Sequence, residues 1–379
     1  MLNCMMMMTK HKVKLGDICI FNYGKSLVAN KRIVGNVPVY SSAGIIGYHN
    51  EPLVNTPGII IGRKGTVGTV YYSPVPFYCI DTAYYIIPNE SIYNLQYLYY
   101  QLKSLKLNKL NEDSAIPGLN RFAAYAQEIS LPPLEEQKRI ADILSAIDDK
   151  IELNRRINAN LEQQAQALYK SWFVDFEPFG GKMPEDWRVG TLGEICITNK
   201  RSYSGKFYNS FEYLDTGSVT SNKIDTIQLL NPTIDKIPSR ARRAVTEGDI
   251  LYSSVRPNQK HYMFLYNPSS NMVVSTGFIV ITANWSGYRY YIYQYLIQDI
   301  VIQHLQSIAE QSVSTYPSIN ASDITNLEIN IPSNKAIEKY ANVMNPIMKQ
   351  ITNNQSENLR LAQLRDTLLP KLMSGEIKV

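Results

Sequence analysis

The chain has 379 residues, of which 45% are hydrophobic and 19% are charged, with a formal net charge of +5. This composition is typical of a globular protein of two or three domains and excludes an intrinsically disordered chain. No apolar run approaches the ~20 residues that cross a bilayer, and the start lacks the apolar core of a secretory signal, so we expect a cytoplasmic protein. The widely spaced Cys4, Cys19, Cys79 and Cys196 argue against a zinc ribbon or a disulfide framework.

The first globular region, residues 1–131, mixes β-branched and tyrosine-rich stretches with glycine and proline. Residues 57–70 and 78–88 predict strands, and residues 93–107 predict a helix. The same mixture returns in residues 179–331, where residues 288–306 predict another helix. We therefore predict an α+β fold with two globular domains.

Two further stretches, residues 132–178 and 332–379, predict long helices. Their apolar residues are spaced alternately by three and four, which is the pattern of a coiled-coil seam. In the second stretch, Pro346 predicts a start or a kink and Pro370 an end or a bend. Asp148 and Asp149 lie between seam positions, so we expect them in solvent. The predicted seam consists of Ile140, Leu144, Ile147, Ile151, Asn154, Asn158, Leu161, Leu168, Met344, Ile347, Ile351, Asn354, Asn358, Leu361 and Leu368.

The two halves of the chain resemble each other. Residues 114–170 align without a gap with residues 314–370, and a weaker repeat pairs residues 15–20 with residues 192–197. The period is too long for a solenoid, so the pattern indicates a duplicated unit made of a globular region and a helix.

The duplication predicts how the helices run. The second globular region connects the end of the first helix to the start of the second, and the termini of a compact domain usually lie close together, so we expect antiparallel helices. Residues 132–179 carry a net charge of −3 and residues 332–379 a net charge of +3, which agrees. Asn154 and Asn158 would then face Asn358 and Asn354, as buried polar pairs that set the register. The alternative is that each helix packs only on its own domain.

The sequence lacks the common catalytic motifs. Gly24-Lys25-Ser26 has Cys19 where a P-loop needs glycine, and Pro132-Pro133 lacks the acid or amide that precedes Pro-Pro in amino-methyltransferases. His11, His49, His261 and His304 show no metal-ligand spacing. We therefore predict no catalytic residue and no metal site.

Two stretches combine small residues with basic ones, as surfaces that contact phosphates and base edges do. Each is equally compatible with a solvated turn. The candidate DNA-binding residues are Tyr40, Ser41, Ser42, Arg63, Lys64 and Thr66 in the first domain, and Arg240, Arg242, Arg243, Ser254, Arg256, Asn258 and Lys260 in the second.

The helical stretches resemble a known family. Residues 131–160, with Ser171 to Phe176, resemble the first conserved region of type I restriction–modification specificity (S) subunits. Residues 368–377 are similar to the family's second conserved region. Residues 62–65, 248–251, 256–257 and 275–278 are similar to segments of its target recognition domains.

This resemblance implies a non-catalytic subunit with target recognition domains at 1–131 and 179–331 and spacer helices at 132–178 and 332–379. Each domain would read half of a bipartite double-stranded DNA target, and the helices would dock two adenine-methyltransferase (M) subunits, which restriction (R) subunits join. S-adenosylmethionine, ATP and Mg2+ are expected on those partners and no cofactor on this chain. The alternatives are a DNA-recognition subunit of a type IIB-like restriction system and a coiled-coil scaffold that does not bind DNA.

Overall fold

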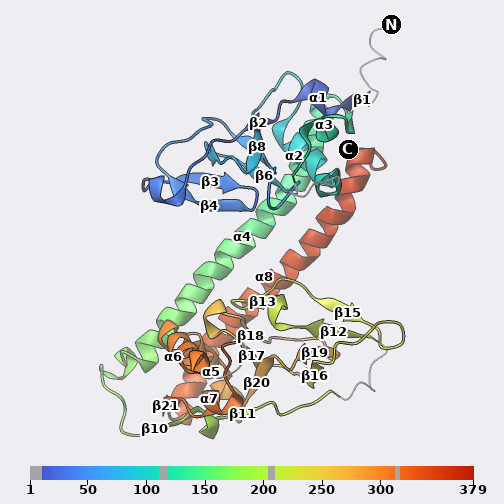
Figure 1. The fold of residues 1–379 in the computed structure, drawn as a ribbon. Coiled ribbons are helices and arrows are strands. Elements are labelled where there is room, and N and C mark those ends of the chain that lie inside the picture. The colour runs from blue at the N-terminus through green and yellow to red at the C-terminus, as the bar shows by residue number, and fades with distance from the viewer. Residues whose placement is uncertain (1–10, 111–117, 204–209, 312–315) are drawn as a thin grey trace. The chain divides into compact units, whose positions relative to one another are not determined.

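The computed structural model describes residues 11–110, 118–203, 210–311 and 316–379 (Figure 1). Cys4, residues 114–117 and residues 314–315 of the repeat lie outside these ranges. The chain divides into two compact units. Unit 1 combines residues 1–152 with residues 358–379, and unit 2 comprises residues 153–357. Each unit therefore contains one globular domain and one half of each long helix.

The domain of unit 1 contains two small sheets. The first has the strand order β2 (Asn22–Tyr23), β8 (Ala83–Ile86), β5 (Gly58–Gly62) and β6 (Val70–Ser73). The second has the order β4 (Gly44–His49), β3 (Val37–Ser41) and β7 (Tyr78–Cys79), with β3 parallel to β7. Helix α2 (Leu95–Ser104) packs on the first sheet, and α1 (Leu15–Ile18) and α3 (Arg121–Tyr125) are short.

The domain of unit 2 repeats this plan, with four strands instead of three in its second sheet. Its first sheet has the order β11 (Cys196–Thr198), β20 (Phe278–Ala283), β17 (Ile250–Ser253) and β18 (Tyr262–Phe264). Its second has the order β15 (Gln228–Leu230), β12 (Phe211–Leu214), β19 (Met272–Ser275) and β16 (Ala241–Ala244), and β13 (Val219–Thr220) forms a hairpin with β14 (Lys223–Ile224).

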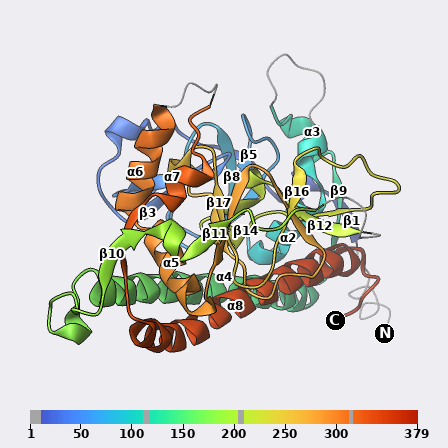
Figure 2. The ribbon, with the colours of Figure 1, turned by 90° about the horizontal axis from the view of Figure 1, so that it is seen from below.

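Three helices accompany these sheets: α5 (Arg289–Leu296), α6 (Asp299–Glu310) and α7 (Ala321–Thr325). Helix α5 lies between the first sheet and the long helices of its unit (Figure 2). The prediction of one helix over residues 288–306 is wrong, because the chain becomes extended at Gln298, with ψ of 135°. No glycine or proline marks this break, so the sequence pattern does not reveal it.

Each domain is closed by a two-stranded sheet that joins its beginning to its end. In unit 1, β1 (His11–Lys14) pairs with β9 (Glu128–Leu131), with Lys14 opposite Glu128. In unit 2, β10 (Arg188–Thr191) pairs with β21 (Glu328–Ile331), with Thr191 opposite Glu328. The partners in the second pair lie 177 and 200 positions beyond those in the first. The repeat found in the sequence is therefore confirmed in the fold.

The two predicted long helices are present as α4 (Leu134–Phe173), of 40 residues, and α8 (Asn334–Ser374), of 41 residues. Helix α8 runs through Pro346 and Pro370, so neither proline begins or ends it. A proline removes one backbone donor from a helix. The buried neighbours Met344, Met348 and Leu372 hold α8 on both sides of these positions. In the described part of the chain, no helix is both long enough and apolar enough to cross a membrane.

The long helices run antiparallel within each unit. In unit 2, Trp172 near the end of α4 packs against Tyr340 near the start of α8, with ring centroids 5.8 Å apart. Asn158, earlier in α4, forms a hydrogen bond with Asn354, later in α8. In unit 1, Arg365 Nη1 donates to Asp148 Oδ1 at 2.7 Å. The predicted seam positions that are buried are Ile140, Leu144, Ile151, Asn154, Asn158, Met344, Ile351 and Asn354. The remaining seam residues, Ile147, Leu161, Leu168, Ile347, Asn358, Leu361 and Leu368, are half-buried.

Buried asparagines connect α4 and α8 in unit 2. Asn354 Nδ2 donates to Asn158 Oδ1 at 2.8 Å, and Asn158 Nδ2 donates to the Ile351 carbonyl at 3.0 Å, so the predicted Asn158–Asn354 pair is confirmed. Asn154 Nδ2 donates to Glu357 at 2.7 Å, one residue before its predicted partner Asn358.

The expectation that Asp148 is solvated is wrong. Its carboxylate accepts hydrogen bonds from Tyr100 at 2.8 Å and from Arg365 at 2.7 Å. Tyr100 belongs to α2, which packs against both long helices and covers this face. A heptad pattern describes only contacts between helices, so it does not anticipate contacts with a third element.

Replacing Asn354 with Leu is expected to lower the free energy of unfolding by about 1–3 kcal/mol, because Asn158 Oδ1 loses its buried donor. Adding Asn158→Leu should restore most of this loss, since two leucines suit an apolar seam. Urea unfolding of the single and double variants measures the coupling, with the exposed Asn160→Leu as control. Additive losses in the double variant would contradict the pairing.

Candidate nucleic-acid interface

One hairpin loop occurs at the same place in both domains. The first loop, residues 63–68, joins β5 to β6, and the Gly62 N–H donates to the Thr69 carbonyl at 2.8 Å across its base. The second loop, residues 254–260, joins β17 to β18, and the Ser253 N–H donates to the His261 carbonyl at 2.9 Å.

Both loops are attached to the same point of the repeat. The Leu119 N–H donates to the Arg63 carbonyl at 2.9 Å, and the Ile319 N–H donates to the Ser254 carbonyl at 2.8 Å. The attached residues lie 200 positions apart and just precede α3 and α7. The two basic stretches of the sequence therefore fall in part on one structural element.

The first loop presents its basic residues beside exposed aromatic rings. The Arg63 guanidinium lies 4.9 Å from the centroid of the Tyr23 ring, and Arg63 Nη1 donates to the Asp81 carbonyl at 3.2 Å. The Arg121 guanidinium lies 5.2 Å from the centroid of the same Tyr23 ring. Lys64 and Thr66, both predicted, are exposed. This arrangement holds Arg63 in place and leaves Lys64 free of the aromatic cluster.

Sequence reasoning missed Tyr23, Arg121 and Phe122. Tyr23 is 49% exposed and Phe122 is 74% exposed. Asn120 caps α3 by accepting hydrogen bonds from the Phe122 and Ala123 N–H groups. The available indication was Asn120, a residue type that caps helices, followed at once by an arginine and a phenylalanine.

The second loop carries Arg256, Asn258 and Lys260. Arg256 is exposed, and its guanidinium lies 5.3 Å from the centroid of the Tyr316 ring, which is itself 58% exposed. The Lys260 ammonium donates to Asp299 at 2.8 Å, and this carboxylate raises the pKa of Lys260. Asn258 is exposed, and its backbone N–H donates to Gln306 at 3.2 Å. Of the predicted residues in the second loop, Arg256 and Asn258 are therefore exposed, and neither forms an ion pair in the described part of the chain.

Arg256 has an unusual backbone conformation. Its φ is +49°. The matching hydrogen bonds of Arg63 and Ser254 make Arg256 the equivalent of Gly65 in the first loop, whose φ is +79°. Glycine adopts this region freely, whereas an arginine there costs about 1–2 kcal/mol. The second domain therefore keeps an arginine side chain where the backbone favours glycine.

Three predicted contact residues are buried and do not form a surface. Tyr40 packs edge-to-face on Phe77 with ring centroids 5.8 Å apart, and burial raises its pKa. Ser41 Oγ donates to the Gly44 carbonyl at 3.3 Å, and the Ser42 carbonyl accepts from Thr69 Oγ1 at 2.6 Å. The prediction that these side chains contact a ligand is wrong, because they hold β3 and the base of the first loop.

The other predicted residues have mixed positions. Ser254 Oγ donates to the Gly277 carbonyl at 2.9 Å, which fixes the start of the second loop. Arg240, Arg242 and Arg243 lie on or beside the edge strand β16, which is a different element from the loop. Arg240 and Arg242 are exposed, whereas burial lowers the pKa of the half-buried Arg243. Among the described residues, no three His, Cys, Asp or Glu side chains gather as a metal site.

A comparison with protein families identifies this duplicated frame. Residues 7–163 and 184–362 each match the type I restriction modification DNA specificity domain. The chain belongs to this family. Its two matched segments correspond to the two halves of the repeat, each made of a globular domain and the long helix that follows. The α+β fold with two such domains and a pair of helices agrees with this membership.

Relatives extend over most of the chain. It is 27% identical over 345 residues to the type I restriction enzyme MjaIX specificity subunit of Methanocaldococcus jannaschii, covering 85% of this chain and 78% of that protein. It is 30% identical over 184 residues to the HindI specificity subunit of Haemophilus influenzae, covering 48% of this chain and 40% of that one. A crystal structure of an S subunit from M. genitalium shares the fold, with a TM-score of 0.66, 17% identity and coverage of 97% and 96%.

The positive φ of Arg256 predicts that two substitutions at this position differ in stability. Arg256→Gly should leave the free energy of unfolding within about 1 kcal/mol of the parent, because relief of the positive φ offsets the lost contact with Tyr316. Arg256→Ala should be less stable than Arg256→Gly by about 1 kcal/mol, since alanine keeps the strain. Thermal unfolding of the two variants checks the order, and equal stabilities would contradict the strained conformation.

Proposed function

We propose that this chain is the subunit that reads the DNA target of a type I restriction–modification complex, with one half of a bipartite sequence read by each domain. One observation carries this proposal. Two equivalent loops, each with basic residues, rest on the same point of a duplicated frame. A duplicated reader suits a target made of two separate half-sites, because each domain then meets one half.

The side chains on the loops suit contact with double-stranded DNA. Arginine and lysine pair with guanine edges, asparagine pairs with adenine, and basic groups in general contact phosphates. Three such side chains are exposed and suit this role: Arg256, Asn258 and Lys64. Arg63 is held against Tyr23 and Asp81, which favours a phosphate contact of fixed position. Arg240 and Arg242 on the edge of the second sheet supply further positive charge near DNA.

The long helices are the proposed docking site for two methyltransferase subunits, which restriction subunits join. Several apolar side chains on their outer faces are exposed: Ile143, Leu153 and Ile157 on α4, and Val343, Leu359 and Leu364 on α8. S-adenosylmethionine, ATP and Mg2+ belong to those partners in this proposal. The chain by itself then neither methylates nor cuts DNA.

Exchange of residues 179–331 for the equivalent region of a relative tests the division into two readers. The methylated motif should change in one half and stay intact in the other, because the first domain is untouched. Mapping of methylated adenines in cells that express the exchanged chain with its methyltransferase subunit gives the answer. A change in both halves, or in neither, would sink the proposal.

Arg256→Ala tests the second loop directly. Specific DNA binding by the complex with the methyltransferase should weaken by about 1–3 kcal/mol if Arg256 reads a base. A phosphate contact would instead weaken all sequences alike and reduce the salt dependence by about one charge. Arg256→Gly should show the same loss without backbone strain, and the exposed Lys182→Ala serves as the control. Unchanged affinity in both Arg256 variants would contradict the assignment.

A further inference from the structure

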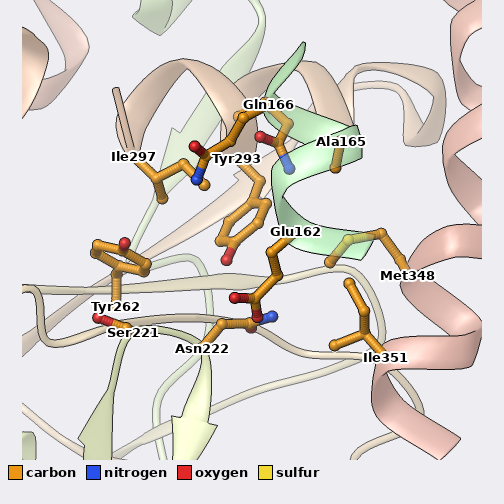
Figure 3. Close-up of a pocket in the computed structure, with 11 residues that line it drawn as sticks. Glu162, Ala165, Gln166, Ser221, Asn222, Tyr262, Tyr293, Ile297, Met348 and Ile351 are labelled. Atoms are coloured by element: carbon orange, nitrogen blue, oxygen red, sulfur yellow. The ribbon is translucent and has the colours of Figure 1, made fainter. Parts of the chain in front are cut away.

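Unit 2 contains a part-open cavity where its domain meets the two long helices (Figure 3). Its empty space, part of which is open solvent, amounts to about 320 Å³. The lining residues are Glu162 and Ala165 of α4, Gln294 and Tyr293 of α5, Met348 of α8, and Tyr262 of β18. In Figure 3 the Glu162 carboxylate and the Tyr293 hydroxyl both point toward Asn222, on the turn between β13 and β14.

The duplication identifies the corresponding place in unit 1. The Tyr97 hydroxyl donates to the Ser130 carbonyl, and the Tyr291 hydroxyl donates to the Asn330 carbonyl, which sets α2 and α5 in the same position. Tyr99, Tyr100 and Lys103 therefore correspond to Tyr293, Gln294 and Ile297. On the long helices, Arg365 and Asp148 correspond to Ala165 and Met348 through the offset of 200 positions.

Unit 1 fills this place with charged side chains. Arg365 Nη1 donates to Asp148 Oδ1 at 2.7 Å, and the Tyr100 hydroxyl donates to the other carboxylate oxygen at 2.8 Å. Lys103 Nζ donates to the Tyr99 hydroxyl at 3.2 Å. Unit 2 has Ala165 and Ile297 where unit 1 has its arginine and lysine. The cavity is thus the space that the longer side chains occupy in the other half of the chain.

An acidic group and an orphaned acceptor remain in unit 2. Glu162 accepts a hydrogen bond from the Asn222 side chain, and burial raises its pKa. Among the described residues, no Lys, Arg or His forms an ion pair with Glu162. Gln294 is 2% exposed, and its Oε1 has no hydrogen-bond partner within the described chain.

These groups complement a planar cation that carries several donors. A carboxylate accepts strong hydrogen bonds from a guanidinium, and an amide oxygen accepts one more. The Tyr262 and Tyr293 rings add faces on which such a cation packs favourably. A buried acceptor without a partner costs free energy, so a donor that reaches Gln294 is stabilising.

We propose that this cavity is a binding site for a guanidinium group, which takes the place that the Arg365 side chain holds in unit 1. The group is held by the Glu162 carboxylate and the Gln294 amide oxygen. It comes either from a free guanidine compound or from an arginine side chain of a subunit that assembles with this chain. The second source rests on the function proposed above, whereas the site itself does not.

Methylguanidinium chloride is the probe, and the methyl group of Met348 is the reporter. In the full chain with 13C-labelled methionine methyl groups, titration should shift the Met348 resonance saturably, in the millimolar range, while methionines distant from the cavity stay unchanged. Methylammonium chloride at the same ionic strength controls for salt, because it lacks the planar fork of donors. A shift that grows linearly without saturation would overturn the site.

Two substitutions test the residues. Glu162→Gln should weaken methylguanidinium binding by about tenfold or more, because it removes the charge from the main acceptor. The exposed Glu135→Gln on the same helix is the matched control. Ala165→Arg should abolish binding, since the chain then supplies the guanidinium as unit 1 does. If Ala165→Arg does not fold, Glu162→Gln still decides, and parental affinity in that variant would refute the proposal.

A last arm separates the two sources. Addition of the methyltransferase subunit to the labelled chain should shift the Met348 resonance and exclude methylguanidinium if that subunit supplies the arginine. If the cavity still binds methylguanidinium in the assembled complex, its ligand is a free guanidine compound. Failure of assembly itself concerns the proposed function, whereas loss of saturable binding in the chain alone concerns the site.

Discussion

The short antiparallel strand pair that closes each domain is the constraint on which the rest of the structure depends. Because β1 pairs with β9 and β10 pairs with β21, each domain ends beside the point where it begins. A long helix follows each closing strand directly. The residues between the closing strands can then vary wherever they do not pack on the long helices, as α2 and α5 do, since the path into and out of the domain is set by backbone hydrogen bonds. Such a frame suits a protein whose two domains differ in the sequence they are proposed to read.

The two halves share a backbone but have diverged in side chains at matching places. Gly65 and Arg256 occupy the same loop position, with φ of +79° and +49°. Arg365 and Ala165 occupy the same helix position, one in an ion pair with Asp148 and the other at the edge of a cavity. At the loop position, Gly65 adopts a positive φ freely and Arg256 does so at a cost in free energy. At the helix position, Arg365 is paired with Asp148, whereas Ala165 lies beside a cavity in which the Gln294 amide oxygen has no partner in the described chain. Such differences at equivalent positions show which side chains the shared fold does not require.

Sequence patterns succeeded where one local rule decides the structure. The alternating spacing of apolar residues predicted α4 and α8, and the duplication predicted their antiparallel direction and the Asn158–Asn354 pair. Patterns failed where a third element intervenes. Asp148 reads as a solvated position of a two-helix seam, but α2 covers it. Tyr40 reads as part of a polar, glycine-rich surface, but it packs on Phe77 inside its sheet.

The sequence by itself determined the duplication, the fold class, the two long helices and the stretches in which basic residues gather. These features follow from periodicity and self-similarity, which are properties of the chain read in order. Only the tertiary structure decided that Arg63 and Arg256 belong to equivalent loops, that Tyr23 and Tyr316 lie beside them, and that a cavity with Glu162 and Gln294 faces no cation within the described chain. The physical reason is that each of these depends on hydrogen bonds and packing between segments far apart in sequence, for which no local pattern provides evidence.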